Sequence, residues 1–195
     1  IHNEQRLPGH AICADGLDEV GGITPISIGN TDQFIKTVPR EVRWRLLNVQ
    51  YVVTYRSVLD DHLGNPVDAT LLLQQGEGKD AIYTYRLNAT NPRAWIVHRV
   101  DALPDRDAIR SALAAPGFDS NQVAYTLASI TTEPSNGTDQ VAVTLIDPAR
   151  LTVDADLNSA GLLVTSEVNY PGWVATVNGV DSSVVEVDGL LRGVP

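Results

Sequence analysis

The chain has 195 residues, of which 43% are hydrophobic and 19% are charged, so it can bury a sizeable core and is not a disordered chain. Its 24 Asp and Glu residues outweigh its 14 Lys and Arg residues and give a net charge of −10, which disfavours nucleic acid and anionic lipid headgroups as partners. A single cysteine, Cys13, excludes an internal disulfide and a cysteine-based zinc site. We therefore expect one globular domain or two small ones, without a bound metal or cofactor.

The N-terminal region carries no targeting or membrane-spanning pattern. No apolar run approaches the roughly 18 residues that cross a bilayer, and the first residues lack the apolar centre of a signal peptide. The chain begins at Ile1 and contains no methionine, so we expect it to be a segment of a longer protein. Residues 1–30 are rich in glycine and lack hydrophobic periodicity, which predicts loops with short strands.

Helical and strand patterns are mixed between residues 31 and 121. Helical turns are expected after residue 31 and over residues 41–47, with Trp44 on the inward face. β-branched and aromatic residues predict strands near residues 51, 83 and 95, and a hairpin turn is expected over residues 75–80. Asp105 is expected to cap a short helix over residues 106–114.

Two polar features of this part are candidates for chemistry, and we favour a structural role for both. Asp60, Asp61 and His62 include metal-ligand types, but adjacent residues rarely point at one ion, so we interpret them as a polar turn. His98 could act as an acid or base, yet no Ser, Cys or carboxylate stands at a suggestive spacing from it. The sequence therefore predicts no catalytic residue and no metal site.

From about residue 122 the hydrophobic period changes to two. Apolar and polar residues alternate over residues 141–145 and 151–155, and an apolar run over residues 162–164 leads into polar residues, with turn signals between these segments. This spacing is typical of an antiparallel sandwich. We predict an α+β fold, with a mixed α/β part over residues 1–121 followed by a C-terminal antiparallel β-sandwich over residues 122–195.

A hairpin is predicted after residue 170. Trp173, Ala175 and Val177 share one face of an expected strand, and the Asn-Gly pair at 178–179 supplies the positive φ angles of a tight turn. Val185 and Val187 resume the period of two, so we expect the return strand there. Because Trp173 is in phase with Ala175 and Val177, we expect it to be a core residue of the sandwich.

Four segments of the chain resemble, in the same order, the C-terminal extracytoplasmic region of the bacterial YfhO-like membrane protein family. Three of them depart from the family pattern, with Ile23 where an aromatic residue is usual, Gln50 where a basic residue is common, and Asn91 where leucine stands. The segments are Gly21 to Pro25, Leu46 to Thr54, Asn91 to Val97, and the series from Tyr170-Pro171-Gly172-Trp173 to Val194-Pro195.

This resemblance implies a context. Members of the family are polytopic membrane proteins similar to lipid-linked-sugar glycosyltransferases, with catalytic carboxylates in a loop that this chain does not contain. The chain would be a non-catalytic domain on the extracytoplasmic face of the bacterial cell membrane, with the membrane-embedded remainder of the parent protein as its partner. It would shape acceptor access or contact the cell envelope. In the family another strand follows Pro195, so its absence would leave an open sheet edge and allow an edge-strand dimer of the isolated fragment.

Two alternatives remain. In a carbohydrate-binding module, Tyr170 and Trp173 would offer ring faces to a sugar of a cell-envelope glycan, and Arg192 would donate hydrogen bonds to its hydroxyl groups. In a self-standing hydrolase, His98 would act with Asp101 or Asp61, although no nucleophile, base and orienting group are assembled by the sequence pattern.

Overall fold

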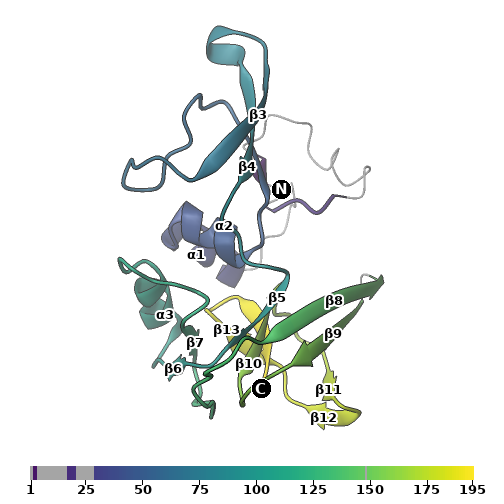
Figure 1. The fold of residues 1–195 in the computed structure, drawn as a ribbon. Coiled ribbons are helices and arrows are strands. Elements are labelled where there is room, and N and C mark those ends of the chain that lie inside the picture. The colour runs from purple at the N-terminus through teal and green to yellow at the C-terminus, as the bar shows by residue number, and fades with distance from the viewer. Residues whose placement is uncertain (1, 4–16, 21–28, 148) are drawn as a thin grey trace. The chain divides into compact units, whose positions relative to one another are not determined.

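The computed structural model of the chain describes residues 2–3, 17–20, 29–147 and 149–195. Cys13, the Gly21-to-Pro25 segment and most of the loop region expected over residues 1–30 lie outside this described part. The fold is α+β, and the described residues form three α-helices, one 3-10 helix and mostly antiparallel strands in several sheets (Figure 1). The chain divides into two compact units: unit 1 holds residues 1–35 and 39–90, and unit 2 holds residues 36–38 and 91–195.

Unit 1 is built on a four-stranded sheet in the order β1-β2-β4-β3. The residues of helix α2 (Arg40–Leu46) include Trp44, which is 3% exposed and packs against Val52 and Tyr85 as predicted for an inward-facing residue. The Tyr85 hydroxyl donates a 2.6 Å hydrogen bond to the carbonyl of Ser57, so this buried phenol is satisfied. The elements of this part of the chain are β1 (His2–Asn3), helix α1 (Gly29–Thr37), β2 (Tyr51–Thr54), β3 (Ala69–Gln75), η2 (Gly78–Asp80) and β4 (Ile82–Leu87); the last two residues of α1 are assigned to unit 2.

Unit 2 is built on a four-stranded antiparallel sheet in the order β13-β14-β10-β5. Its strands are β5 (Ala94–Val97), β10 (Leu162–Val168), β13 (Val185–Val187) and β14 (Leu191–Val194). Apolar side chains of all four strands are fully buried, among them Val97, Val164, Val187 and Leu191. Burying an aliphatic side chain of this size stabilises a fold by about 1.5–3 kcal/mol, so this sheet holds the core of the unit.

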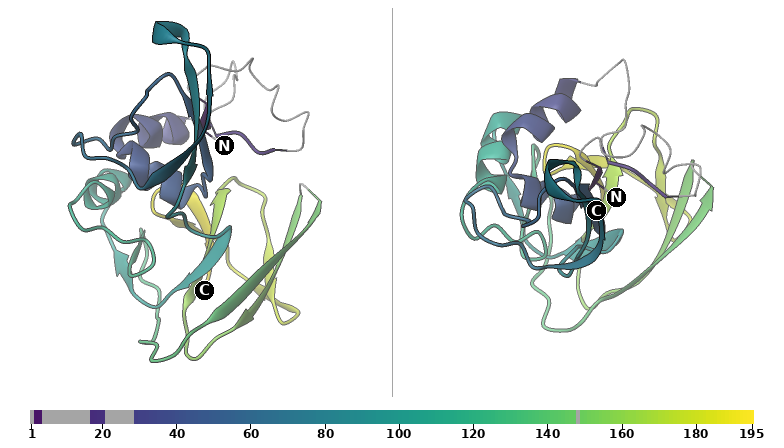
Figure 2. Two further views of the ribbon diagram at one scale, coloured as in Figure 1. Left: turned by 45° about the horizontal axis from the view of Figure 1, so that its top comes forward. Right: turned by 90° about the horizontal axis from the view of Figure 1, so that it is seen from above.

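Smaller elements complete unit 2. Asp105 caps helix α3 (Arg106–Leu113) by accepting a 2.8 Å hydrogen bond from Ala108 N, as predicted, and Ile109 and Leu113 form the buried stripe of the helix. Figure 2 shows β8 and β9 as one long antiparallel ribbon. The remaining strands are the parallel pair β6 (Val100–Ala102) and β7 (Ala124–Thr126), the hairpin β8 (Gln140–Asp147) and β9 (Arg150–Asp156), and the hairpin β11 (Ala175–Val177) and β12 (Val180–Ser182).

The C-terminal strands pair differently from the prediction. The turn at Asn178-Gly179 has the expected positive φ angles, but it places Val180 directly opposite Val177, so the return strand is β12 and not the segment around residue 185. Residues 185–187 instead form β13, which pairs with β14 across a second turn at Asp188-Gly189, also with positive φ at both residues. The segment expected to form one hairpin therefore forms two, β11–β12 with its turn at Asn178-Gly179 and β13–β14 with its turn at Asp188-Gly189.

One other expectation about pairing is corrected. The strand near residue 95 was expected among the N-terminal elements, but β5 pairs with β10, because its buried residues Ala94, Trp95 and Val97 need the apolar partners that this sheet provides. Unit 2 includes residues 91–195, so β5 belongs to the same compact unit as β10. Strand β14 has a neighbour on both sides, and the edge strands of this sheet are β13 and β5.

Candidate functional site

The structure brings together two of the three residues predicted to bind carbohydrate. Trp173 lies in the loop between β10 and β11, and Arg192 lies on β14, where it is 8% exposed. The Arg192 Cζ atom stands 3.7 Å from the centre of the Trp173 ring, which is a cation–π contact. Tyr170, three residues before Trp173, is 41% exposed. The indole therefore covers the guanidinium, while the phenol faces solvent.

Arg192 is an unusual buried cation. Its Nη2 atom donates a 3.1 Å hydrogen bond to the carbonyl oxygen of Val168, which is a neutral acceptor, and its Nε atom has no hydrogen-bond partner among the described residues. Glu167 is engaged by Arg93, whose Nε and Nη2 atoms both donate to Glu167 Oε1. Burial lowers the pKa of Arg192, because the charged form loses its hydration.

Trp173 is not the core residue that its phase on the strand favours. It is half-buried, and one face of its ring is occupied by Arg192. Ala175 and Val177 lie in β11, which pairs only with β12 and does not join the four-stranded sheet of the unit. Residues 175–177 belong to a separate two-stranded ribbon on which Val177 is 45% exposed, and Trp173, which precedes this ribbon, stacks on Arg192 instead of entering a hydrophobic core.

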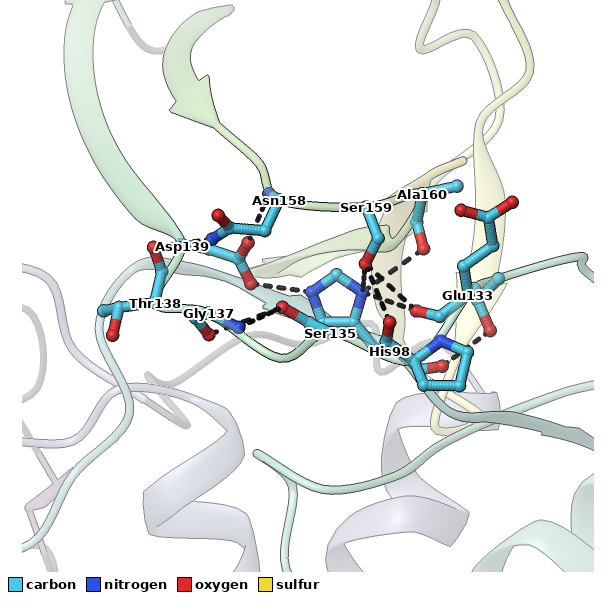
Figure 3. A network of polar contacts seen from close by, with 11 residues as sticks. His98, Glu133, Ser135, Gly137, Thr138, Asp139, Asn158, Ser159 and Ala160 are labelled. Atoms are coloured by element: carbon cyan, nitrogen blue, oxygen red, sulfur yellow. Dashed lines mark hydrogen bonds and ion pairs between the residues drawn. The ribbon is translucent and has the colours of Figure 1, made fainter.

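His98 is the centre of a polar network that the sequence did not predict (Figure 3). Its Nε2 atom lies 2.7 Å from Asp139 Oδ2, and its Nδ1 atom lies 3.0 Å and 3.2 Å from the carbonyl oxygens of Glu133 and Ala160. The side chains of His98 and Asp139 are only 16% and 15% exposed. This network links the end of β5, the segment before β8 and the turn between β9 and β10.

The partners of His98 fix its protonation. Nδ1 faces two carbonyl oxygens, which only accept hydrogen bonds, so Nδ1 carries a hydrogen. Nε2 faces a carboxylate, which favours a hydrogen there as well. Burial opposes the charge, but the hydrogen bonds to Asp139, Ala160 and Glu133 outweigh it and raise the pKa of His98. Burial alone would raise the pKa of Asp139. The hydrogen bond from His98 Nε2 and a 3.1 Å hydrogen bond from Asn158 N outweigh burial and lower this pKa.

With Ser159, the network contains the three residue types of a Ser-His-Asp catalytic triad, but the serine hydroxyl does not face a basic nitrogen. Its Oγ atom lies 3.3 Å from His98 Nδ1, but it lies equally 3.3 Å from the carbonyl oxygens of Glu133 and Pro134, which can take its hydrogen. A general base must offer a lone pair to the serine hydroxyl. His98 Nδ1 carries a hydrogen and has none to offer, so Ser159 is not activated as a nucleophile.

Packing around the imidazole explains one further residue. A Cβ atom on Gly161 would lie 2.6 Å from Ile96 Cγ2 and 3.1 Å from His98 Cε1, so only glycine fits beside the ring. The network is thus held by its surroundings as well as by its hydrogen bonds. The network joins, by hydrogen bonds, segments that lie far apart in the sequence, which is a structural role.

The carboxylates named for a hydrolase have other partners. Asp101 Oδ2 accepts a 2.7 Å hydrogen bond from Arg99. Asp61 Oδ2 accepts a 3.0 Å hydrogen bond from the Asn65 side chain, and Asp61 Oδ1 accepts bonds of 2.8 Å from Asn65 N and Leu63 N, as in the predicted polar turn. These bonds, that of the Asn65 side chain first, lower the pKa of Asp61. Among the described residues, no group of three or more His, Cys, Asp or Glu side chains is placed to hold a metal ion.

One further carboxyl group is buried, and no residue in the described ranges forms an ion pair with it. Asp188, at the turn between β13 and β14, is 1% exposed and accepts a 2.8 Å hydrogen bond from Tyr125 N. Burial raises its pKa to about 7, against the opposing effect of that hydrogen bond. Asp188 N also donates to Tyr125 O, so the residue joins β7 to the β13–β14 turn and serves the fold.

Comparison of the chain with protein-family models, with curated proteins and with solved structures found no match. Within the described ranges, no helix is long and apolar enough to cross a membrane.

Proposed function

We propose that this chain is a non-catalytic extracytoplasmic domain of a polytopic membrane protein that resembles the YfhO-like family and lipid-linked-sugar glycosyltransferases. It packs on the membrane-embedded remainder of that protein and shapes acceptor access or contact with the cell envelope, on the extracytoplasmic face of the bacterial cell membrane. The non-catalytic assignment rests on the hydrogen bonding of His98, whose Nδ1 atom faces two carbonyl oxygens and therefore carries a hydrogen. The clusters seen at His98 and Asp61 in the described residues are satisfied structurally and leave no base beside a nucleophile.

The sandwich architecture is part of this proposal. We propose that β8 and β9 supply a second layer against the four-stranded sheet of unit 2. In support, β8 runs beside β5, and the side chains of Val141, Val143, Leu151 and Val153 are half-buried while the residues between them are exposed. The free edges β13 and β5 are where an edge-strand dimer of the isolated chain would form.

A carbohydrate-binding module is the second proposal, and the placement of Tyr170, Trp173 and Arg192 favours it. Tyr170 is exposed close to Trp173, and the Trp173 ring has no ring contact among the described residues other than the one with Arg192. A sugar ring would stack on the remaining indole face, beside Tyr170. The ligand would be a cell-envelope glycan.

Two assays on the purified chain separate these proposals from a hydrolase. The non-catalytic proposal predicts no turnover of glycosides or esters, and turnover that His98→Ala abolishes while Asp101→Asn retains would contradict it. A glycan array then tests sugar binding. Saturable binding that is lost in Trp173→Phe and Arg192→Ala, with the circular dichroism spectrum intact, would favour the carbohydrate-binding module, whereas no binding leaves the accessory domain.

A further inference from the structure

The β11–β12 hairpin and the residue before it expose apolar side chains: Val174, Val177 and Val180 are 88%, 45% and 69% exposed. Within the part of the chain that the structure describes, β11 and β12 pair only with each other. A two-stranded ribbon is marginal by itself, and contiguous exposed apolar residues mark interaction sites on soluble surfaces. Figure 1 shows the hairpin at the periphery of unit 2.

The tip face of the hairpin carries no charge. Val177 and Val180 are directly opposite each other, so they share a face with Ala175 and Ser182. The one charged residue of the ribbon, Asp181, stands opposite Thr176 and therefore on the other face. In a chain of net charge −10, this neutral face fits an uncharged partner better than a charged protein surface.

The residues at the base of the hairpin point to the chemistry of that partner. Tyr170 and Trp173 precede β11, and amphipathic aromatic rings of this kind concentrate at the boundary between hydrocarbon and water in membranes. Beneath Trp173 lies the Arg192 guanidinium, which stacks on the indole and holds it at the base of the hairpin. From Trp173 to Val177 an extended strand spans about 13 Å, comparable with the roughly 5–10 Å by which interfacial segments enter a bilayer.

We propose that the β11–β12 hairpin is a lipid-contacting element, which rests its valine tip on the surface of a zwitterionic bilayer. Val177 and Val180 enter the acyl boundary, and the two aromatic rings lie among the headgroups, with the buried Arg192 supporting the Trp173 ring from beneath. The net charge of the chain directs the hairpin to zwitterionic rather than anionic lipid. This deepens the proposed function by naming the surface that a membrane-associated domain would turn to the bilayer.

The test is co-sedimentation of the 195-residue chain with phosphatidylcholine vesicles over a range of lipid concentrations. We expect saturable partitioning that Val177→Asp combined with Val180→Asp weakens at least ten-fold. The matched control, Val58→Asp combined with Leu63→Asp, adds the same charge at residues that are 58% and 70% exposed elsewhere, and we expect less than a two-fold change. Val177→Thr with Val180→Thr keeps the shape and strand propensity of the tip, and should weaken binding about three-fold even if the aspartate pair disturbs the hairpin.

A second readout locates the contact. Trp44 and Trp95 are 3% and 5% exposed, so quenching of tryptophan fluorescence by brominated phosphatidylcholine should come from Trp173 and should be lost in Trp173→Phe.

Three results would overturn the proposal: no partitioning, partitioning that needs anionic lipid, or self-association in solution that the tip variants abolish, which would make the hairpin a protein interface. The turnover assay is independent of these results. A chain that is inactive and does not bind vesicles would refute only the lipid contact, and a chain that binds vesicles and is active would refute only the non-catalytic assignment.

Discussion

Replacing Asp139 with asparagine should destabilise unit 2 in mild acid and hardly at all in mild alkali. In the folded chain, the carboxylate accepts a 2.7 Å hydrogen bond from His98 Nε2 and a 3.1 Å hydrogen bond from Asn158 N. Both side chains of the His98–Asp139 pair are mostly buried, so solvent screens their interaction only partly. A hydrogen bond to a charged group contributes about 1.5–3 kcal/mol, and we expect Asp139→Asn to lower the free energy of unfolding by about 2 kcal/mol at pH 5.5.

The pH dependence follows from the two pKa shifts. The pKa of His98 is raised, so its contribution is complete below the ordinary value of 6.5 and is lost as pH rises through the raised value. The pKa of Asp139 is lowered, so its contribution is complete above 3.8 and is lost as pH falls through the lowered value. Once the pH exceeds that raised value, a neutral His98 with its hydrogen on Nδ1 can accept a bond from the new amide, whose oxygen still accepts from Asn158 N. The cost there should be about 0.5 kcal/mol or less.

Urea unfolding followed by tryptophan fluorescence at pH 5.5 and pH 9 measures this difference. Asp101→Asn is the matched control, because it removes the same charge from a carboxylate whose partner, Arg99, is exposed, and it should cause no measurable loss at either pH. An equal loss for Asp139→Asn at both pH values would refute the protonated His98 on which the non-catalytic assignment depends.

Three further substitutions in unit 2 are checked by the same unfolding assay. Asp188→Asn should stabilise the chain by about 1–3 kcal/mol at pH 8 and not at pH 4, because burial raises the pKa of Asp188 to about 7 and opposes its ionised form. Gly193→Ala should cost about 1–3 kcal/mol, because its Cβ atom would lie 2.5 Å from Val187 Cγ2. Trp173→Ala should cost about 1–2 kcal/mol by uncovering Arg192; a loss of about 3–5 kcal/mol would instead place Trp173 in a core.

Local features of the fold were predictable because short-range physics decides them. The carboxylate of Asp105 satisfies the N-terminus of α3, and Trp44 follows the helical period onto the sheet. The turn at Asn178-Gly179 needs positive φ at both residues, which Asn and Gly adopt most readily. The pairing of β13 was missed because Asp188-Gly189, interpreted as the end of a strand, is a second turn of the same kind.

The polar network could not be predicted because it depends on contacts between distant segments. His98 and Asp139 are 41 positions apart, and the carbonyl oxygens that face Nδ1 belong to the backbone of Glu133 and Ala160, whose side chains carry no signal of that role. The stacking of Arg192 under Trp173 likewise requires β14 to lie beside β10, which only the sheet order establishes. For His98, the sequence-based interpretation as a structural histidine agrees with the geometry, although its partners were unknown.

Protease accessibility in spheroplasts tests whether the domain lies on the extracytoplasmic face of the cell membrane. Cells that carry the protein are converted to spheroplasts, treated with protease and probed with an antibody raised against the 195-residue chain, with a cytosolic protein as the control. The account predicts that the antigen fractionates with membranes and is degraded in intact spheroplasts while the control survives. An antigen that is degraded only after the spheroplasts are lysed would contradict it.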